Sequence, residues 1–104
     1  MYDMKISVGY LPTGKVLGLS KIARIADMVC KRLQLQERIG NDIAYIIQKV
    51  TGTKNVIVHI EAEHSCVTMR GIRKEGVKTT TLTKSGAFND DSIKTEFLRL
   101  IDAI

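Results

Sequence analysis

The chain has 104 residues, of which 44% are hydrophobic and 26% are charged, and its formal net charge is +5 at pH 7. This length supports one hydrophobic core and excludes a second, so we expect a single domain over residues 1–104 with an anionic partner. Two cysteines without an export signal argue against a disulfide framework, and no apolar run is long enough to cross a membrane, so we expect a cytoplasmic protein.

The first half of the sequence predicts a strand and two helices. Alternating apolar residues predict a strand over residues 5–12 and a turn at 13–14. Apolar residues at helical spacing predict a helix from Ser20, a candidate N-cap, and a second helix that Gly52 ends. Gly40 costs this second helix about 1 kcal/mol, so we expect it to face a close packing partner. The apolar stripe of the second helix is Ile39, Ile43, Ile46, Ile47 and Val50.

The second half predicts two strands and a terminal helix. A β-branched run predicts a long strand over residues 55–71, with an antiparallel partner over 77–86 and a polar turn at 74–76. Acidic residues followed by apolar residues at helical spacing predict a helix over 90–104. The three strands form a thin antiparallel sheet. Its first strand has no earlier partner, so we expect an exposed edge that something else covers.

Two polar segments are candidate binding sites. GLSKIAR (residues 18–24) combines a helix start with the hydroxyl of Ser20 and the cations Lys21 and Arg24, which suits a polyphosphate; the alternative is a capped helix with two solvated cations. QLQERIG (residues 34–40) places Glu37 where its carboxylate can accept two hydrogen bonds from guanine. The alternative is that Glu37 stabilises the helix start and pairs with Arg38 or another cation.

A third segment, EAEHSCVTMRG (residues 61–71), has a candidate pair of metal ligands beside an anion binder. Strict alternation places His64 and Cys66 on one face of a strand, with the anion binder Arg70 further along. A catalytic zinc takes about three protein ligands. His59 has the opposite parity and Cys30 falls on the apolar side of the first helix, so neither completes the set. The alternative is a small buried Cys66 beside a hydrogen-bonded His64.

Four segments together resemble the C-terminal catalytic part of GTP cyclohydrolase I, in family order and spacing from about Lys5 to the end. They are GYLPTGKVLGLSKIARIADMVCKRLQLQERIGNDIA, IEAEHSCVTMRGI, TTTLTKSGAF and EFLRLI. The resemblance implies the α+β tunnelling fold, an antiparallel sheet with two inserted helices. It also implies a homo-oligomer whose subunits join edge to edge in stacked rings, in the family a decamer.

The resemblance also implies an activity, a cofactor and site residues. The family hydrolyses GTP to 7,8-dihydroneopterin triphosphate and formate with zinc, a first step toward tetrahydrofolate or biopterin. By resemblance, Gln36 and Glu37 hold guanine, His64 acts near the scissile purine ring and Cys66 is a zinc ligand. The residues that match the triphosphate contacts are Ser20, Lys21, Arg24 and Arg70.

One family segment has no counterpart in this sequence. The other zinc ligands, a Cys and a His, and a further catalytic His lie in a Cys-Glu-His-His segment on the first of the usual four strands, which is missing here. We therefore expect that a longer protein or another chain supplies this strand, or that the metal chemistry is lost. The alternative function is a non-catalytic module that binds a purine or pterin triphosphate or assembles with a homologue. With three Tyr, two Phe and no Trp, binding of nucleic acid is disfavoured.

Overall fold

The structure is a computed structural model that describes residues 2–31, 35–67 and 73–102, with side chains described for 4–31, 35–63 and 78–102. The predicted order of strands and helices is confirmed, with one addition, the short 3-10 helix η1. No helix within these ranges is long and apolar enough to span a membrane. The elements are β1 (Tyr2–Tyr10), α1 (Leu19–Cys30), α2 (Gln36–Thr51), β2 (Val56–Val67), β3 (Arg73–Lys84), η1 (Gly86–Asn89) and α3 (Asp91–Asp102).

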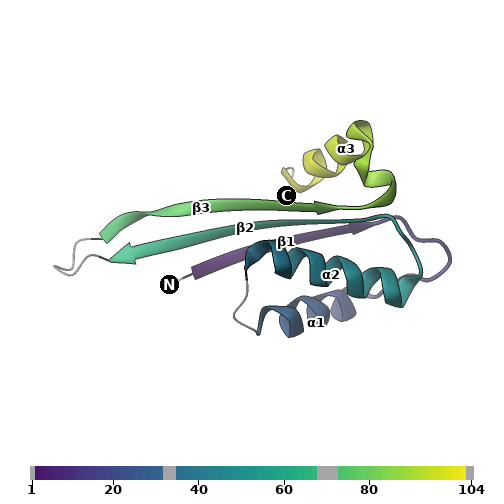
Figure 1. Cartoon of the computed structure of the whole chain (residues 1–104), viewed down its shortest axis with the longest axis horizontal. Helices are drawn as coiled ribbons and strands as arrows, with labels where there is room; N and C mark the ends of the chain where they lie inside the picture. The colour runs from purple at the N-terminus through teal and green to yellow at the C-terminus, as the bar shows by residue number, and fades with distance from the viewer. Residues whose placement is uncertain (1, 32–34, 68–72, 103–104) are drawn as a thin grey trace.

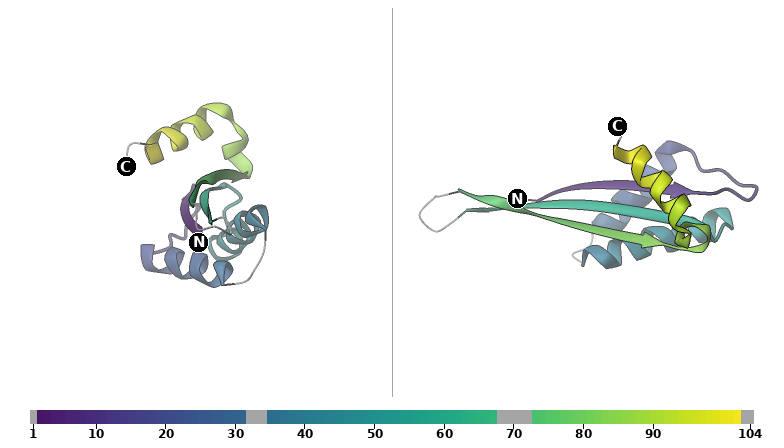
Figure 2. Two further views of the ribbon diagram at one scale, coloured as in Figure 1. Left: turned by 90° about the vertical axis from the view of Figure 1, so that its left-hand side faces the viewer. Right: turned by 90° about the horizontal axis from the view of Figure 1, so that it is seen from above.

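The fold is α+β, built on an antiparallel three-stranded sheet in the order β1-β2-β3. Helices α1 and α2 cover one face of the sheet, and α3 lies over the other (Figures 1 and 2). In the described part of the sheet β1 pairs with β2 alone, so its outer edge is open, as the sequence predicts. Unpaired backbone groups on such an edge are a template for another strand.

The core forms because β2 is covered on both faces. Successive side chains of a strand point to opposite faces, so Val58 and Ile60 face α1 and α2 while Ile57 faces α3, and all three are completely inaccessible to solvent. Burial of these β-branched side chains stabilises the sheet through the hydrophobic effect. The buried residues between the sheet and the two helices are Ile25, Val29, Ile39, Ile43, Ala44, Ile47, Val56, Val58 and Ile60.

Helix α1 begins at a different residue from the one predicted. Gly18 is the N-cap, in an extended conformation, and its carbonyl accepts the N–H groups of Lys21 (3.1 Å) and Ile22 (3.2 Å). Ser20 lies one residue inside the helix, so its prediction as N-cap is wrong. The α1 N-cap makes no side-chain hydrogen bond, which leaves the N–H groups of Leu19 and Ser20 open to a ligand.

Helix α2 contacts β3 closely through Gly40. A Cβ atom at this position would lie 2.6 Å from Thr83 Oγ1 and 3.6 Å from Ile60 Cδ1, which confirms the predicted close packing partner. The helix ends as predicted at Gly52, whose φ of 76° is in the left-handed region and whose N–H donates to the Gln48 carbonyl. One residue of the predicted stripe, Val50, is 41% exposed because it lies in the last turn.

Strands β2 and β3 form a ribbon that projects beyond the helices (Figure 1). The predicted turn at residues 74–76 is wrong, because these residues belong to β3. One residue separates His64 from Cys66, whereas two separate their partners Val77 and Lys74, so β3 has a bulge at residues 75–76. Gly76 is therefore part of a bulge, a common position for glycine inside a strand. The segment that joins the strands, residues 68–72, lies outside the described residues.

Aromatic contacts hold helix α3 on the face of the sheet opposite to α1 and α2. Phe97 meets Phe88 of η1 edge to face, with 6.2 Å between ring centroids. The Phe97 ring also lies over Gly9, where a Cβ would approach it to 2.7 Å. The carboxylate of Asp90 accepts hydrogen bonds from the hydroxyl and the N–H of Ser92, which lower the pKa of Asp90 and satisfy the start of the helix.

Replacement of Gly40 by Ala should destabilise the protein even though Ala favours helices. The new methyl group meets Thr83, so we expect Gly40→Ala to lower the free energy of unfolding by about 1–2 kcal/mol in urea denaturation. In a Thr83→Ala background the same change should be neutral or stabilising, because the contact is absent. Equal stability of Gly40→Ala and the parent would contradict this packing.

Candidate functional site

The start of α1 has the features of an anion site. Ser20, Lys21 and Arg24 are all exposed, and the first turn contains no acidic residue. Lys21 and Arg24 are three residues apart and lie on neighbouring positions of the helix surface. The positive end of the helix dipole, the open N–H groups and the two cations together favour a polyphosphate.

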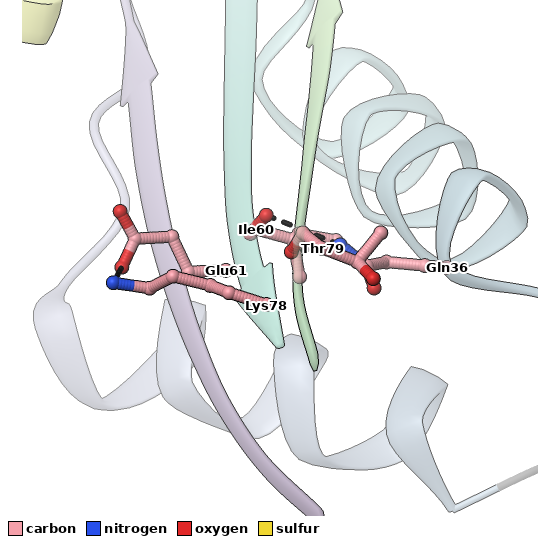
Figure 3. Close-up of polar contacts among 5 residues, drawn as sticks. All are labelled: Gln36, Ile60, Glu61, Lys78 and Thr79. Atoms are coloured by element: carbon pink, nitrogen blue, oxygen red, sulfur yellow. Dashed lines mark hydrogen bonds and ion pairs between the residues drawn. The ribbon is translucent and has the colours of Figure 1, made fainter. Parts of the chain in front are cut away.

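The start of α2 is held on the sheet by Gln36. Its Nε2 donates to the carbonyl oxygens of Ile60 in β2 (3.2 Å) and Thr79 in β3 (3.1 Å), as Figure 3 shows. These two bonds use both N–H groups of the amide, so the Oε1 atom remains as an acceptor. Gln36 is half-buried, in keeping with this position between helix and sheet.

Glu37 follows Gln36 directly but is exposed to solvent. Consecutive residues of a helix differ by about 100° around its axis, so Glu37 shares the outer face with Asn41 and Tyr45, which are also exposed. Among the residues whose side chains are described, Glu37 forms no ion pair, so the predicted alternative of a pair with Arg38 does not form there. The carboxylate is open to a ligand.

His64 and Cys66 lie near the end of β2. His64 is paired in register with Tyr2 of β1 and Val77 of β3, and Cys66 is paired with Lys74. The side chains of His64 and Cys66 are outside the described set, and Arg70 lies outside the described residues altogether. The described residues include no group of three or more His, Cys, Asp or Glu able to hold a metal ion.

His59 and Cys30, which the sequence analysis excludes as metal ligands, lie away from the end of β2. His59 is half-buried on the α3 face of β2, between Val58 and Ile60, which face the other helices. Cys30 ends α1 and is exposed, but its Sγ atom lies 4.0 Å from Sδ of Met4, a residue packed against the core, so it lies on the apolar side of the helix as predicted. Partial burial of the thiol is the main cause of a raised pKa at Cys30, and the negative charge of Asp27 raises this pKa further. The thiol is therefore protonated at neutral pH.

The candidate residues are spread along β1 rather than gathered at one point. The Tyr10 hydroxyl contacts Leu17, so the start of α1 lies at the Tyr10 end. Gln36 contacts Ile60, whose partner is Ile6, and His64 is level with Tyr2. A strand rises about 3.3 Å per residue, so the eight steps from Tyr2 to Tyr10 place the level of His64 about 26 Å along the strand from the Tyr10 end, where α1 starts.

The α3 face of the sheet carries a charged groove that the sequence analysis did not single out. Glu61 forms an ion pair with Lys78 (3.7 Å) on the side of the ribbon away from Gln36 (Figure 3). The groove has a volume of about 210 Å³. Polar residues alternate along the strands on this face, and this alternation in the sequence could have predicted the groove. The lining residues are Met4, Lys5, Glu61, Ala62, Glu63 and Lys78.

Comparison with known proteins gives one consistent result. A family model described as GTP cyclohydrolase I matches residues 1–102. The chain is 58% identical over 101 residues to the GTP cyclohydrolase 1 of Clostridium botulinum (strain Loch Maree / Type A3), covering 97% of this chain and 52% of the relative. It is 57% identical over 104 residues to that of Clostridium acetobutylicum, covering 99% and 53%. The chain thus spans about half the length of the curated relatives it matches.

The raised pKa of Cys30 predicts slow alkylation at neutral pH. The rate of modification of Cys30 by iodoacetamide, followed by peptide mass spectrometry, should rise with pH to a midpoint above the ordinary thiol value of about 8.5. Asp27→Asn removes a nearby negative charge and should lower the midpoint, because the thiolate is then less disfavoured. A midpoint below the ordinary value, or one that Asp27→Asn raises, would contradict this environment.

Proposed function

The chain belongs to the GTP cyclohydrolase I family, and from this premise we propose that it forms the C-terminal catalytic part of an enzyme that opens the imidazole ring of GTP. The products are 7,8-dihydroneopterin triphosphate and formate, on a route to folate or biopterin. The observation that supports this most is the uncapped start of α1, where Ser20, Lys21 and Arg24 surround open N–H groups. Such a site suits the triphosphate of the substrate.

The substrate is held at its two ends by different elements. At the phosphate end, Lys21 and Arg24 neutralise charge, the Ser20 hydroxyl donates a hydrogen bond, and Arg70 adds a second guanidinium. At the base end, the Glu37 carboxylate accepts hydrogen bonds from the N–H and amino groups of guanine. Gln36, beside it, has Oε1 as a remaining acceptor.

This chain alone does not provide a complete catalytic zinc site. Cys66, with His64 beside it, gives at most two ligands, whereas a catalytic zinc takes about three. When bound, zinc lowers the pKa of a coordinated water. We assign Cys66 as one ligand and expect the others from a segment that this chain does not contain. His64 is the proton carrier at the purine ring as the ring opens.

We propose that more than one copy of the chain contributes to the site. His64 is level with Tyr2, at the other end of β1 from Tyr10 and the start of α1, and these two ends are about 26 Å apart along the strand. The phosphate end of one copy therefore serves the reacting end of another. The open edge of β1 and the projecting ribbon are the surfaces available for this assembly. By resemblance the assembly is a ring, as in a decamer.

A second candidate function is a binding module without catalysis. The sequence offers Cys66 alone as a family zinc ligand, which favours this alternative for the chain by itself. Such a module would bind a purine or pterin triphosphate, or assemble with a homologue, through the same helix starts. Turnover separates the two candidates, because both predict nucleotide binding.

A chimera tests whether the residues of this chain are catalytically competent. This chain should replace the corresponding half of the Clostridium acetobutylicum relative, to which it is 57% identical. We expect the chimera, incubated with GTP and zinc, to release a product that gives fluorescent neopterin after oxidation. The chain alone should give none, since most metal ligands are absent. An assembled, zinc-loaded chimera without product would support the binding module.

Glu37 should determine preference for the base. In the chimera, Glu37→Ala should weaken GTP binding by about 10- to 100-fold, because charged hydrogen bonds to guanine are lost, with little change for ATP. Glu96→Ala is the matched control, since Glu96 pairs with Arg99 on α3. Isothermal titration with both nucleotides provides the measurement. Equal weakening for GTP and ATP would contradict the assignment of Glu37 to the base.

A further inference from the structure

The segment between β1 and α1 is anchored to the fold at its two ends. At its start, the Leu11 N–H donates to the Asn55 carbonyl (3.0 Å) and the Thr53 hydroxyl donates to the Leu11 carbonyl (2.6 Å). At its end, the Leu17 N–H donates to the Tyr10 hydroxyl (2.7 Å). Residues 12–16 between these anchors are exposed. The direction in which the chain enters α1 is therefore set at Leu17.

The Tyr10 anchor is short and partly shielded from water. A distance of 2.7 Å is at the lower end of the range for N–H···O hydrogen bonds, and Tyr10 and Leu17 are half-buried against the core. The Leu17 carbonyl lies 3.5 Å from the same hydroxyl, too far to add much. The single strong bond at this point thus comes from one oxygen atom of a side chain at the end of β1.

The hydrogen bond from Leu17 to Tyr10 is made one residue before the N-cap of α1. Leu17 precedes Gly18, whose carbonyl receives the N–H groups of Lys21 and Ile22. No side chain caps α1, so the orientation of its open N–H groups depends on how residues 17 and 18 are held. Between residues 12 and 18, within the described part of the chain, the Tyr10 bond is the one that ties this segment to a strand.

We infer that Tyr10 is a positioning residue for the triphosphate: its hydroxyl holds Leu17 and so aims the first turn of α1 and Lys21 at the phosphates. This inference rests on the proposed function, in which the start of α1 is the phosphate end of the site. Tyr10 touches neither substrate nor metal in this role. Its loss should weaken phosphate contacts and leave guanine contacts at Glu37 intact.

Calorimetric titration of the chain with inorganic tripolyphosphate tests the inference apart from catalysis and base recognition. Tyr10→Phe removes one oxygen and should weaken binding by about three- to tenfold, as expected for one hydrogen bond. Tyr45→Phe is the matched control, because Tyr45 is exposed on α2 and its ring contacts Lys49 rather than the segment before α1; the affinity of this variant should be unchanged. Lys21→Ala removes a proposed phosphate contact and should also weaken binding.

The outcomes separate this inference from the proposed function. Unchanged affinity in Tyr10→Phe with a loss in Lys21→Ala would overturn the role of Tyr10 and leave the phosphate site standing. Unchanged affinity in Lys21→Ala, or no binding by the parent chain, would overturn the phosphate site and the role of Tyr10 with it. Loss in both variants but not in Tyr45→Phe is the expected result.

Two further measurements exclude a merely structural role. Hydrogen exchange at the Leu17 amide should be slow in the parent and faster in Tyr10→Phe, at a temperature where circular dichroism shows equal helix content. In the chimera, Tyr10→Phe should raise KM for GTP with kcat nearly unchanged, the pattern of lost uniform binding. A lowered Tm with unchanged KM and unchanged tripolyphosphate affinity would show that Tyr10 only stabilises the fold.

Discussion

The burial of β2 on both faces is the constraint that organises this molecule. Because its alternate residues must enter two different cores, the strand has one workable register with each neighbour, and a shift of one residue would reverse both faces. Val58 and Ile60 place α1 and α2 on one side, and Ile57 places α3 on the other. The positions of the helix starts, and hence of the candidate ligand groups, follow from this register.

The same constraint explains why the chain is elongated. A compact chain of this length has a radius of gyration of about 13 Å, whereas this one has 15.4 Å, because the β2–β3 ribbon extends beyond the helices that cover the rest of the sheet. An extended ribbon and an open strand edge gain burial when a second chain covers them. The assembly and the shared site that we propose are therefore both compatible with this one geometry.

Local features of the sequence were sufficient for most of the fold. Helical periodicity and β-branched runs predict the order of the elements, and the steric properties of glycine predict the contact at Gly40 and the end of α2 at Gly52. Two local predictions, the turn at Gly76 and the N-cap at Ser20, are wrong because tertiary context determines the structure at these positions. Gly76 marks a bulge rather than a turn, and Ser20 lies inside a helix that Gly18 begins. Local patterns indicate candidate ligands such as Lys21, Glu37 and Cys66, and the resemblance implies their roles, whereas their spacing along β1 depends on strand register, which no local pattern contains.

The two ends of the proposed site are positioned by the same kind of hydrogen bond. In each case one polar side chain joins the start of a helix to the sheet: Tyr10 holds Leu17 before α1, and Gln36 holds the first turn of α2 against β2 and β3. The ligand groups, Lys21 and Glu37, are then left exposed within a few residues of each anchor. A helix start that is fixed by a hydrogen bond to the sheet loses little further freedom when its exposed neighbour binds a ligand. The sheet register thus determines where Lys21 and Glu37 are presented, and in the function that we propose these two side chains recognise different parts of the nucleotide.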